Sequence, residues 1–190
     1  KAEINLSPPN PKFPTISFLA ACALRPLAPE ESMKIHLITV GKTKEAHFRD
    51  AIHHYEEIIS RLAEFTYFEA REISNDPVRE GQALLELLAK RGFVGHGKAK
   101  IILLEVEGKG MSSEAFAEKI GRARDSGTQD YVFLIGGAFG FSGKLREALA
   151  SAEKLSLAPL TFTHELARVV LCEQIYRALH ILSGSKYHHS

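Results

Sequence analysis

The sequence predicts an α/β protein with a mostly parallel sheet flanked by helices. Two observations lead to this fold class. From Met33 onward, stretches typical of strands alternate with stretches typical of helices, and five strands interleaved with helices imply a parallel sheet. Two of the strands, 100–106 and 131–135, are apolar at successive positions, as expected for parallel strands covered on both faces.

The first half of this region is predicted to form two strand and helix pairs. A β-branched run at 35–40 ends at Gly41 and precedes a helix near 44–64 that has one apolar stripe. A second strand is expected at 65–73. Asn75 or Asp76 then caps a helix that carries Pro77 in its first turn.

The second half continues the alternation. Ser112 or Ser113 starts the helix that follows the third strand, and Ser142 starts a short helix after the fourth. The elements expected here are a strand at 100–106, a helix to about 126, a strand at 131–135, a short helix, a strand around 155–158 and a long helix from Thr163 to about Leu182.

Composition excludes several broad classes of protein. The chain has 190 residues, 45% of them hydrophobic and 25% charged, which is typical of folded proteins and not of disordered or fibrous chains. The net charge is +1, so an RNA partner would need a local basic patch. Cys22 and Cys172 stand 150 positions apart without a CxxC motif, which argues against a disulfide framework or a structural zinc site and favours a reducing compartment.

Residues 1–32 are expected to form a disordered leader, because they hold six of the eight prolines. Their richness in Pro, Ser and Ala resembles an organellar transit peptide. A secretory signal, in which 19–22 resembles a lipoprotein cleavage box, and an artefactual extension are the alternatives. The apolar run at 16–24 is far shorter than the roughly 20 residues that a membrane helix needs, and none is expected in the chain.

A glycine-rich segment at 136–143 directly follows the apolar strand at 131–135. Glycines at such a place let a ligand lie against the main chain, although a tight turn between strand and helix is the alternative interpretation. The spacing matches neither the dinucleotide fingerprint nor the phosphate loop, where Leu145 would replace the Ser or Thr that holds magnesium. The segment His164 to Arg168 resembles HExxH except at its last position, so no zinc protease and no metal site are expected.

The long C-terminal helix carries apolar residues on more than one stripe. We therefore expect it to pack on both the sheet and a second subunit. The last 23 residues also gather cationic and titratable groups together with the aromatic side chains of Tyr176 and Tyr187, which makes them the expected RNA-contacting patch. These groups are Arg168, Arg177, His180, Lys186, His188 and His189.

Six segments together resemble the RlmH family of ribosomal RNA large-subunit methyltransferases, which belongs to the SPOUT class. The segments are MKIHLITVGK at 33–42, LEVEGK at 104–109, LIGG at 134–137, LSLAPLTF at 155–162, THELARVVLCEQIYR at 163–177 and YH at 187–188. The resemblance covers essentially all of 33–190, and the segments occur in the same order as in the family. It implies a trefoil-knotted methyltransferase domain there, a homodimer, S-adenosylmethionine as methyl donor, and N3 methylation of a pseudouridine in large-subunit ribosomal RNA.

The resemblance also implies a set of site residues. The cofactor site would comprise Leu104, Gly136, Leu157, Ala158, Pro159, Leu160, Thr161 and Phe162. His188 would accept the proton of the target base, Arg168 would hold phosphate or stabilise the base anion, and Tyr187 would stack on the base.

The sequence departs from the family at both ends. His189 and Ser190 follow the Tyr187–His188 pair, where family members often end in Lys or Arg. The leader suggests a plastid or mitochondrial protein, with a cytoplasmic one as the alternative. Because no RNA-binding domain is appended, we expect the dimer to recognise the assembled ribosome. A methyltransferase of another RNA and a non-catalytic ribosome-binding factor are the alternative functions.

Overall fold

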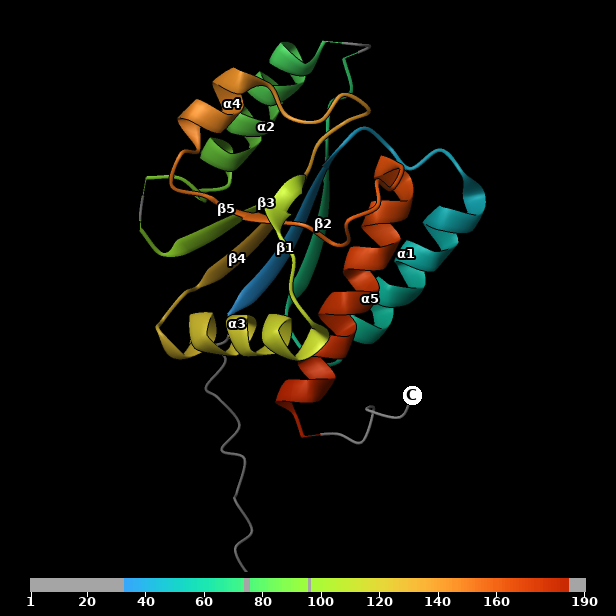
Figure 1. Cartoon of the computed structure of the whole chain (residues 1–190), viewed down its shortest axis with the longest axis vertical. Coiled ribbons are helices and arrows are strands. Elements are labelled where there is room, and N and C mark those ends of the chain that lie inside the picture. The colour runs from blue at the N-terminus through green and yellow to red at the C-terminus, as the bar shows by residue number, and fades with distance from the viewer. Residues whose placement is uncertain (1–32, 74–75, 96, 185–190) are drawn as a thin grey trace, which may run out of the picture.

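Five parallel strands form a single sheet in the order β2-β1-β4-β3-β5 (Figure 1). The computed structural model describes residues 33–73, 76–95 and 97–184. The strands are β1 (Lys34–Val40), β2 (Phe65–Ala70), β3 (Ala99–Lys109), β4 (Asp130–Ile135) and β5 (Glu153–Leu155). The helices are α1 (Ala46–Ile59), α2 (Pro77–Lys90), α3 (Ser113–Asp125), α4 (Gly143–Ala148) and α5 (His164–Leu182). The α/β fold with a parallel sheet is thus confirmed.

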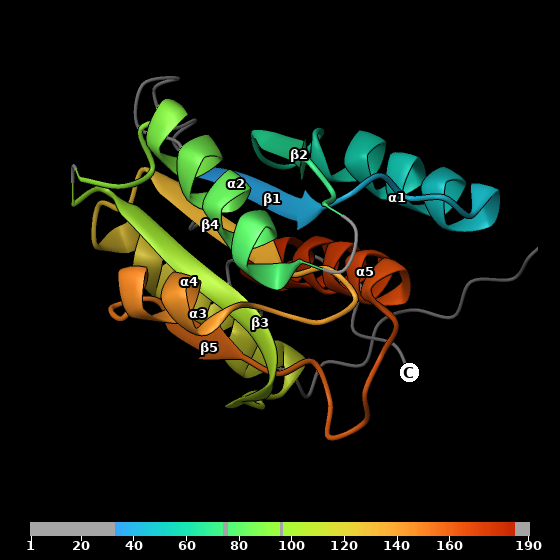
Figure 2. The same cartoon turned by 90° about the horizontal axis from the view of Figure 1, so that it is seen from above.

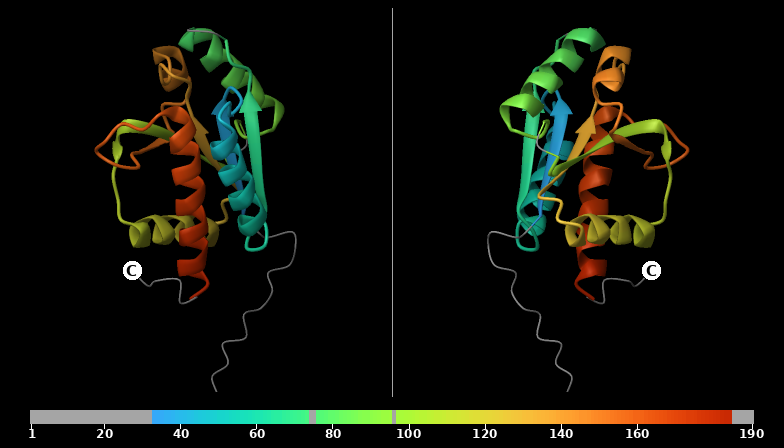
Figure 3. Two further views of the ribbon diagram at one scale, coloured as in Figure 1. Left: turned by 90° about the vertical axis from the view of Figure 1, so that its right-hand side faces the viewer. Right: turned by 90° about the vertical axis from the view of Figure 1, so that its left-hand side faces the viewer.

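The helices cover the two faces of the sheet unequally. Helices α1, α3 and α5 pack on one face, where Phe133 of β4 meets Phe116 of α3 and Ile175 of α5. Helices α2 and α4 pack on the other face against Ile38 and Leu134. Figure 1 shows α5 beside α1 and α4 beside α2, and Figure 3 shows α3 crossing the C-terminal part of α5.

Four helices begin at the capping residues that the sequence predicts. The side chains of Asp76, Ser112, Ser142 and Thr163 each accept a hydrogen bond from a backbone N–H of the first helical turn. Such a bond stabilises a helix end by about 0.5–2 kcal/mol because the first N–H groups have no partner within the helix. The helix starts therefore follow directly from local chemistry.

The expected strand around 155–158 is wrong in its position. Strand β5 runs from Glu153 to Leu155, because Leu155 pairs with both Leu104 and Lys109 of β3 and the chain then leaves the sheet. The connection from β5 to α5 and the glycine-rich connection from β4 to α4 both lie at the carboxyl end of the strands (Figure 2). No helix in the described part of the chain is long and apolar enough to cross a membrane.

Candidate functional site

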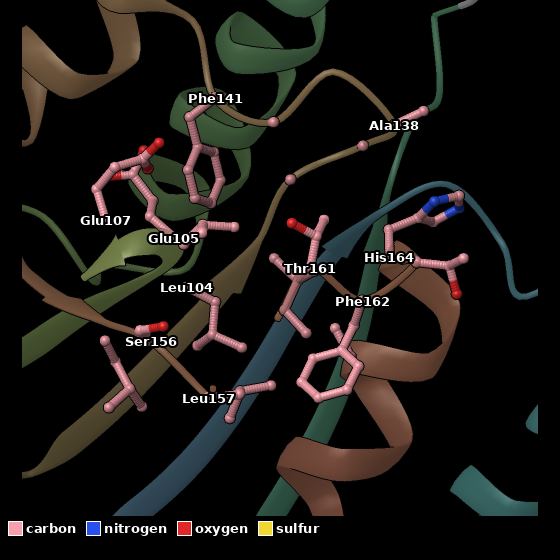
Figure 4. Close-up of a pocket in the computed structure, with 18 of the residues that line it drawn as sticks. Leu104, Glu105, Glu107, Ala138, Phe141, Ser156, Leu157, Thr161, Phe162 and His164 are labelled. Atoms are coloured by element: carbon pink, nitrogen blue, oxygen red, sulfur yellow. The ribbon is translucent and has the colours of Figure 1, made fainter. Parts of the chain in front are cut away.

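A cavity of about 570 Å³ opens at the carboxyl ends of β3, β4 and β5. Its walls come from 104–107, from the loop at 135–141, from the loop at 155–163 and from the first turn of α5. Figure 4 shows Leu104 and Leu157 on one side of this space and Thr161 near its centre. The volume lies within the range of roughly 300–1,000 Å³ that is typical of small-molecule and cofactor sites.

The glycine-rich loop is a tight turn closed by its own backbone. The N–H of Gly140 donates to the carbonyl of Gly137 at 3.0 Å, and Gly140 has φ +68°. A Cβ on Gly136 would come within 2.9 Å of the Gly140 carbonyl carbon. The tight turn expected as the alternative interpretation is therefore present, and it also lines the cavity.

The turn rests on a buried carboxyl group from α2. A Cβ on Gly137 would lie only 2.6 Å from Oε2 of Glu80, so a larger residue there would displace the end of the Glu80 side chain. Burial raises the pKa of Glu80, and the negative charges of Glu72 and Asp76 raise it further. The hydrogen bond from the backbone N–H of Ile73 lowers it, but by less. Glu80 therefore supports the turn from outside the cavity.

The wall formed by β3 carries an ion-pair cluster. The Glu105 side chain is only 4% exposed and its carboxylate contacts Nε of Arg146 at 2.5 Å and Nζ of Lys154 at 3.0 Å. These contacts join β3 to α4 and β5 at the edge of the cavity. Because both cations are engaged with Glu105, the described wall offers little free positive charge to a ligand.

The first turn of α5 places a histidine and a carboxylate side by side. His164 lines the cavity (Figure 4), and burial together with the charge of Arg168 lowers its pKa, so its imidazole is neutral near pH 7. The Glu165 carboxylate accepts hydrogen bonds from the backbone N–H groups of Lys44 at 3.0 Å and Glu45 at 3.2 Å. Burial works to raise the pKa of Glu165, but these bonds and the nearby positive charge outweigh it and hold the pKa below its usual value.

Arg168 is fully buried, one turn further along α5. Its guanidinium donates to the carbonyls of Val40 at 2.6 Å and Gly41 at 3.0 Å, and to side-chain oxygens of Thr43 at 2.9 Å and Tyr67 at 3.2 Å. Arg168 thus ties α5 to the carboxyl ends of β1 and β2. A side chain held in this way does not reach the cavity or the solvent, and the RNA contact expected from the sequence does not fit this placement.

The cavity brings most of the expected cofactor residues together. Seven of the eight line it, and Pro159 is the one that does not; the seven are Leu104, Gly136, Leu157, Ala158, Leu160, Thr161 and Phe162. Tyr187 and His188 lie outside the described residues. His164 and Phe139 also line the cavity, although neither is among the site residues expected from the sequence.

A family model described as predicted SPOUT methyltransferase matches residues 33–188. The chain belongs to the SPOUT methyltransferase family. It is 41% identical over 163 residues to the ribosomal RNA large subunit methyltransferase H of Geotalea daltonii, a match that covers 83% of this chain and all of that protein.

Other SPOUT relatives carry the same name. The protein of Streptococcus thermophilus is 39% identical over 170 residues, covering 82% of this chain and 99% of the relative. That of Geobacter metallireducens is 40% identical over 164 residues, covering 83% of this chain and all of the relative. These matches confirm the resemblance to the RlmH family. In the described ranges, no group of three or more His, Cys, Asp or Glu side chains is arranged to hold a metal ion.

Proposed function

We propose that this SPOUT methyltransferase transfers a methyl group from S-adenosylmethionine to N3 of a pseudouridine in large-subunit ribosomal RNA. The observation that carries the proposal is the cavity at the carboxyl ends of β3, β4 and β5, which gathers seven residues expected at a methyl-donor site. The relatives that share about 40% of their residues with this chain are named as ribosomal RNA large-subunit methyltransferases, and this supports the choice of substrate.

The residues that line the cavity fit S-adenosylmethionine. Leu104, Leu157 and Phe162 provide apolar surface for an adenine ring, while the turn at 136–140 presents backbone atoms at close range. When bound, this cofactor supplies a methyl group on a positively charged sulfur. The enzyme must hold this methyl group in line with the attacking nitrogen in a largely desolvated pocket, and neither task needs a metal.

The target nitrogen carries an imide proton that must leave when the new N–C bond forms. We assign its removal to His188, with Tyr187 stacking on the base, on the strength of the match at 187–188. His164 is a neutral imidazole that lines the cavity, so it is the comparison residue in any test of this assignment.

We assign Arg168 a positioning role instead of a contact with RNA. Its bonds to the carbonyls of Val40 and Gly41 fix the start of α5 relative to the sheet. The neighbouring residues Thr163, His164 and Ala167 line the cavity, so their positions depend on this anchor.

Homodimerisation and recognition of the assembled ribosome are part of the proposal. Leu166, Val169 and Val170 of α5 are only partly buried and belong to neither core cluster, which supports a second subunit on this helix. A compact chain offers little surface for reading an RNA sequence, so the shape of the ribosome would supply the specificity.

The test is transfer of labelled methyl from S-adenosylmethionine to ribosomes from cells that lack this modification. We expect label in large-subunit RNA within assembled ribosomes and little label in free RNA. The variant His188→Ala should lower the rate about 10²- to 10⁴-fold, the usual effect of losing a general base, whereas His164→Ala should leave more activity. An unchanged rate in His188→Ala would contradict the assignment of the base.

A further inference from the structure

The mouth of the cavity is unusually apolar. Among the described residues, the three most exposed large hydrophobic side chains are Leu160, Phe139 and Val106, at 74%, 63% and 50%. All three line this cavity, and they come from three different segments: the loop after β5, the glycine-rich turn and β3. Exposed apolar side chains gathered at one opening are typical of a binding surface.

Phe139 is presented on a rigid support. It stands between Ala138 and Gly140 in the turn closed by the hydrogen bond from Gly140 to Gly137, where even an added methyl group on Gly136 would meet backbone. Among the described aromatic side chains, no ring lies against Phe139. The ring therefore lies largely exposed at the mouth of the cavity, with no other described aromatic ring against it.

The chemistry of the proposed reaction requires an unpaired base. N3 of a pyrimidine-type base lies on its Watson–Crick edge, so a paired base hides the atom that is to be methylated. A base that leaves its stack loses stacking energy and needs a new flat surface. Aromatic side chains commonly provide such a surface for unstacked RNA bases.

We propose that Phe139 is the stacking platform for the target base at the mouth of the cavity, where Leu160 adds apolar surface. A protein partner seated over Phe139, Leu160 and Val106 together would cover the opening through which the base must enter, so the position of these residues favours RNA. This inference rests on the proposed function. The stacking surface at Phe139 is separate from the one assigned above to Tyr187.

The test compares Phe139→Ala and Phe139→Trp in the full-length chain. The control is Val78→Ala on α2, a large hydrophobic residue that is 45% exposed and does not line the cavity. Methyl transfer is measured against the concentration of unmodified ribosomes, binding of S-adenosylmethionine by calorimetry, and the mass of the particle by sedimentation.

We expect Phe139→Ala to raise the KM for ribosomes between about fivefold and 150-fold, the range set by loss of one base-stacking contact. Donor affinity, particle mass and kcat should stay near those of the unaltered chain. Phe139→Trp should restore most of the ribosome affinity, and Val78→Ala should change nothing.

Three results would overturn the inference. An unchanged KM would show that no base stacks on Phe139. A loss of donor affinity without a change in KM for ribosomes would place Phe139 against the cofactor, and a lower particle mass would place it in an interface between copies. If the unaltered chain transfers no methyl group to ribosomes, the proposed function itself fails and this inference falls with it.

Discussion

Glu165 and Arg168 fasten the start of α5 to the connection between β1 and α1. Helix α1 has no side-chain cap of its own, and Glu165 supplies a carboxylate to the backbone N–H groups of Lys44 and Glu45 at that end. A negative charge at a helix N-terminus is also favoured by the helix dipole. One buried carboxylate thus stabilises α1 and positions the cavity-lining turn of α5.

We expect Glu165→Gln to lower the free energy of unfolding by about 1–3 kcal/mol near pH 7, because two charge-assisted hydrogen bonds weaken. The matched control is Glu118→Gln on α3, whose exposed pair with Arg122 should contribute less than about 1 kcal/mol. Urea unfolding of both variants measures the difference. An equal loss in both would contradict the role of Glu165.

The pH dependence of this effect has a definite sign. The pKa of Glu165 is lowered on folding from an ordinary value of 4.5, so the unfolded chain takes up its proton first as the pH falls. The stabilisation is complete above pH 4.5 and is lost as the pH falls through the lowered pKa. In Glu165→Gln this part of the acid destabilisation should be missing.

Substitution of Gly136 tests most directly whether the glycine-rich turn forms part of the S-adenosylmethionine site. In Gly136→Ala the new Cβ would lie 2.9 Å from backbone of Gly140, so the turn that lines the cavity must shift. We expect the affinity for S-adenosylmethionine to fall at least about tenfold, a change of roughly 1.4 kcal/mol. Gly143→Ala, where an added Cβ meets nothing within 4 Å, is the control.

Calorimetric titration of the two variants gives the comparison. Equal donor affinity in Gly136→Ala and Gly143→Ala would mean that the turn does not form part of the donor site.

At the scale of elements, the contact between β3 and β5 determines where the cavity loop begins. A Cβ on Gly108 would lie 2.4 Å from the carbonyl carbon of Leu155, closer than real structures allow. Leu155 in turn pairs with Leu104 and Lys109, and the loop at 156–163 follows it directly. The close approach of the two backbones therefore fixes the wall of the cavity.

We expect Gly108→Ala to destabilise the fold by about 1–3 kcal/mol, as overpacking of a close-packed site does, and to weaken donor binding as well. Gly110→Ala changes the same residue type two positions away, where an added Cβ meets nothing within 4 Å, and should be nearly neutral. Thermal unfolding with and without S-adenosylmethionine measures both effects. A stable Gly108→Ala that binds the donor normally would show that the backbones can separate without harm.

The helices and strands also show which parts of the fold can be predicted from the sequence alone. Local signals were sufficient for the helix starts, because Asp76, Ser112, Ser142 and Thr163 cap the turns that immediately follow them. They were insufficient for β5 and for the end of β3, because both depend on the approach of Gly108 to Leu155 from a distant part of the chain. Pairing between remote segments leaves no periodic pattern in either one.

The same distinction holds for the candidate site. The glycine-rich turn was predictable, since a run of glycines after an apolar strand has a local meaning. The burial of Arg168 was not, because its partners lie on β1 and β2 and in the β1–α1 connection, more than 100 positions away. A basic residue near the end of a sequence is ordinarily exposed, and only the folded sheet shows that this one is an internal anchor.

At the scale of the whole molecule, the chain forms one parallel sheet with the cavity at a single edge. This arrangement agrees with the general rule that ligands of open α/β sheets bind beyond the carboxyl ends of the strands. The trefoil knot implied by family resemblance, the homodimer and the identity of 1–32 as a leader stay predictions. The homodimer bears on function most directly, since Leu166 and Val170 of α5 are only partly buried and belong to neither core cluster.

The most direct test of the central claim is to map the methylated nucleotide. Ribosomes that lack the modification are incubated with the full chain and S-adenosylmethionine, and the large-subunit RNA is digested and analysed by mass spectrometry. We expect one added methyl group, on N3 of a pseudouridine, in the large-subunit RNA alone. A methyl group on another atom or another RNA, or no methyl group from a chain that binds the donor, would contradict it.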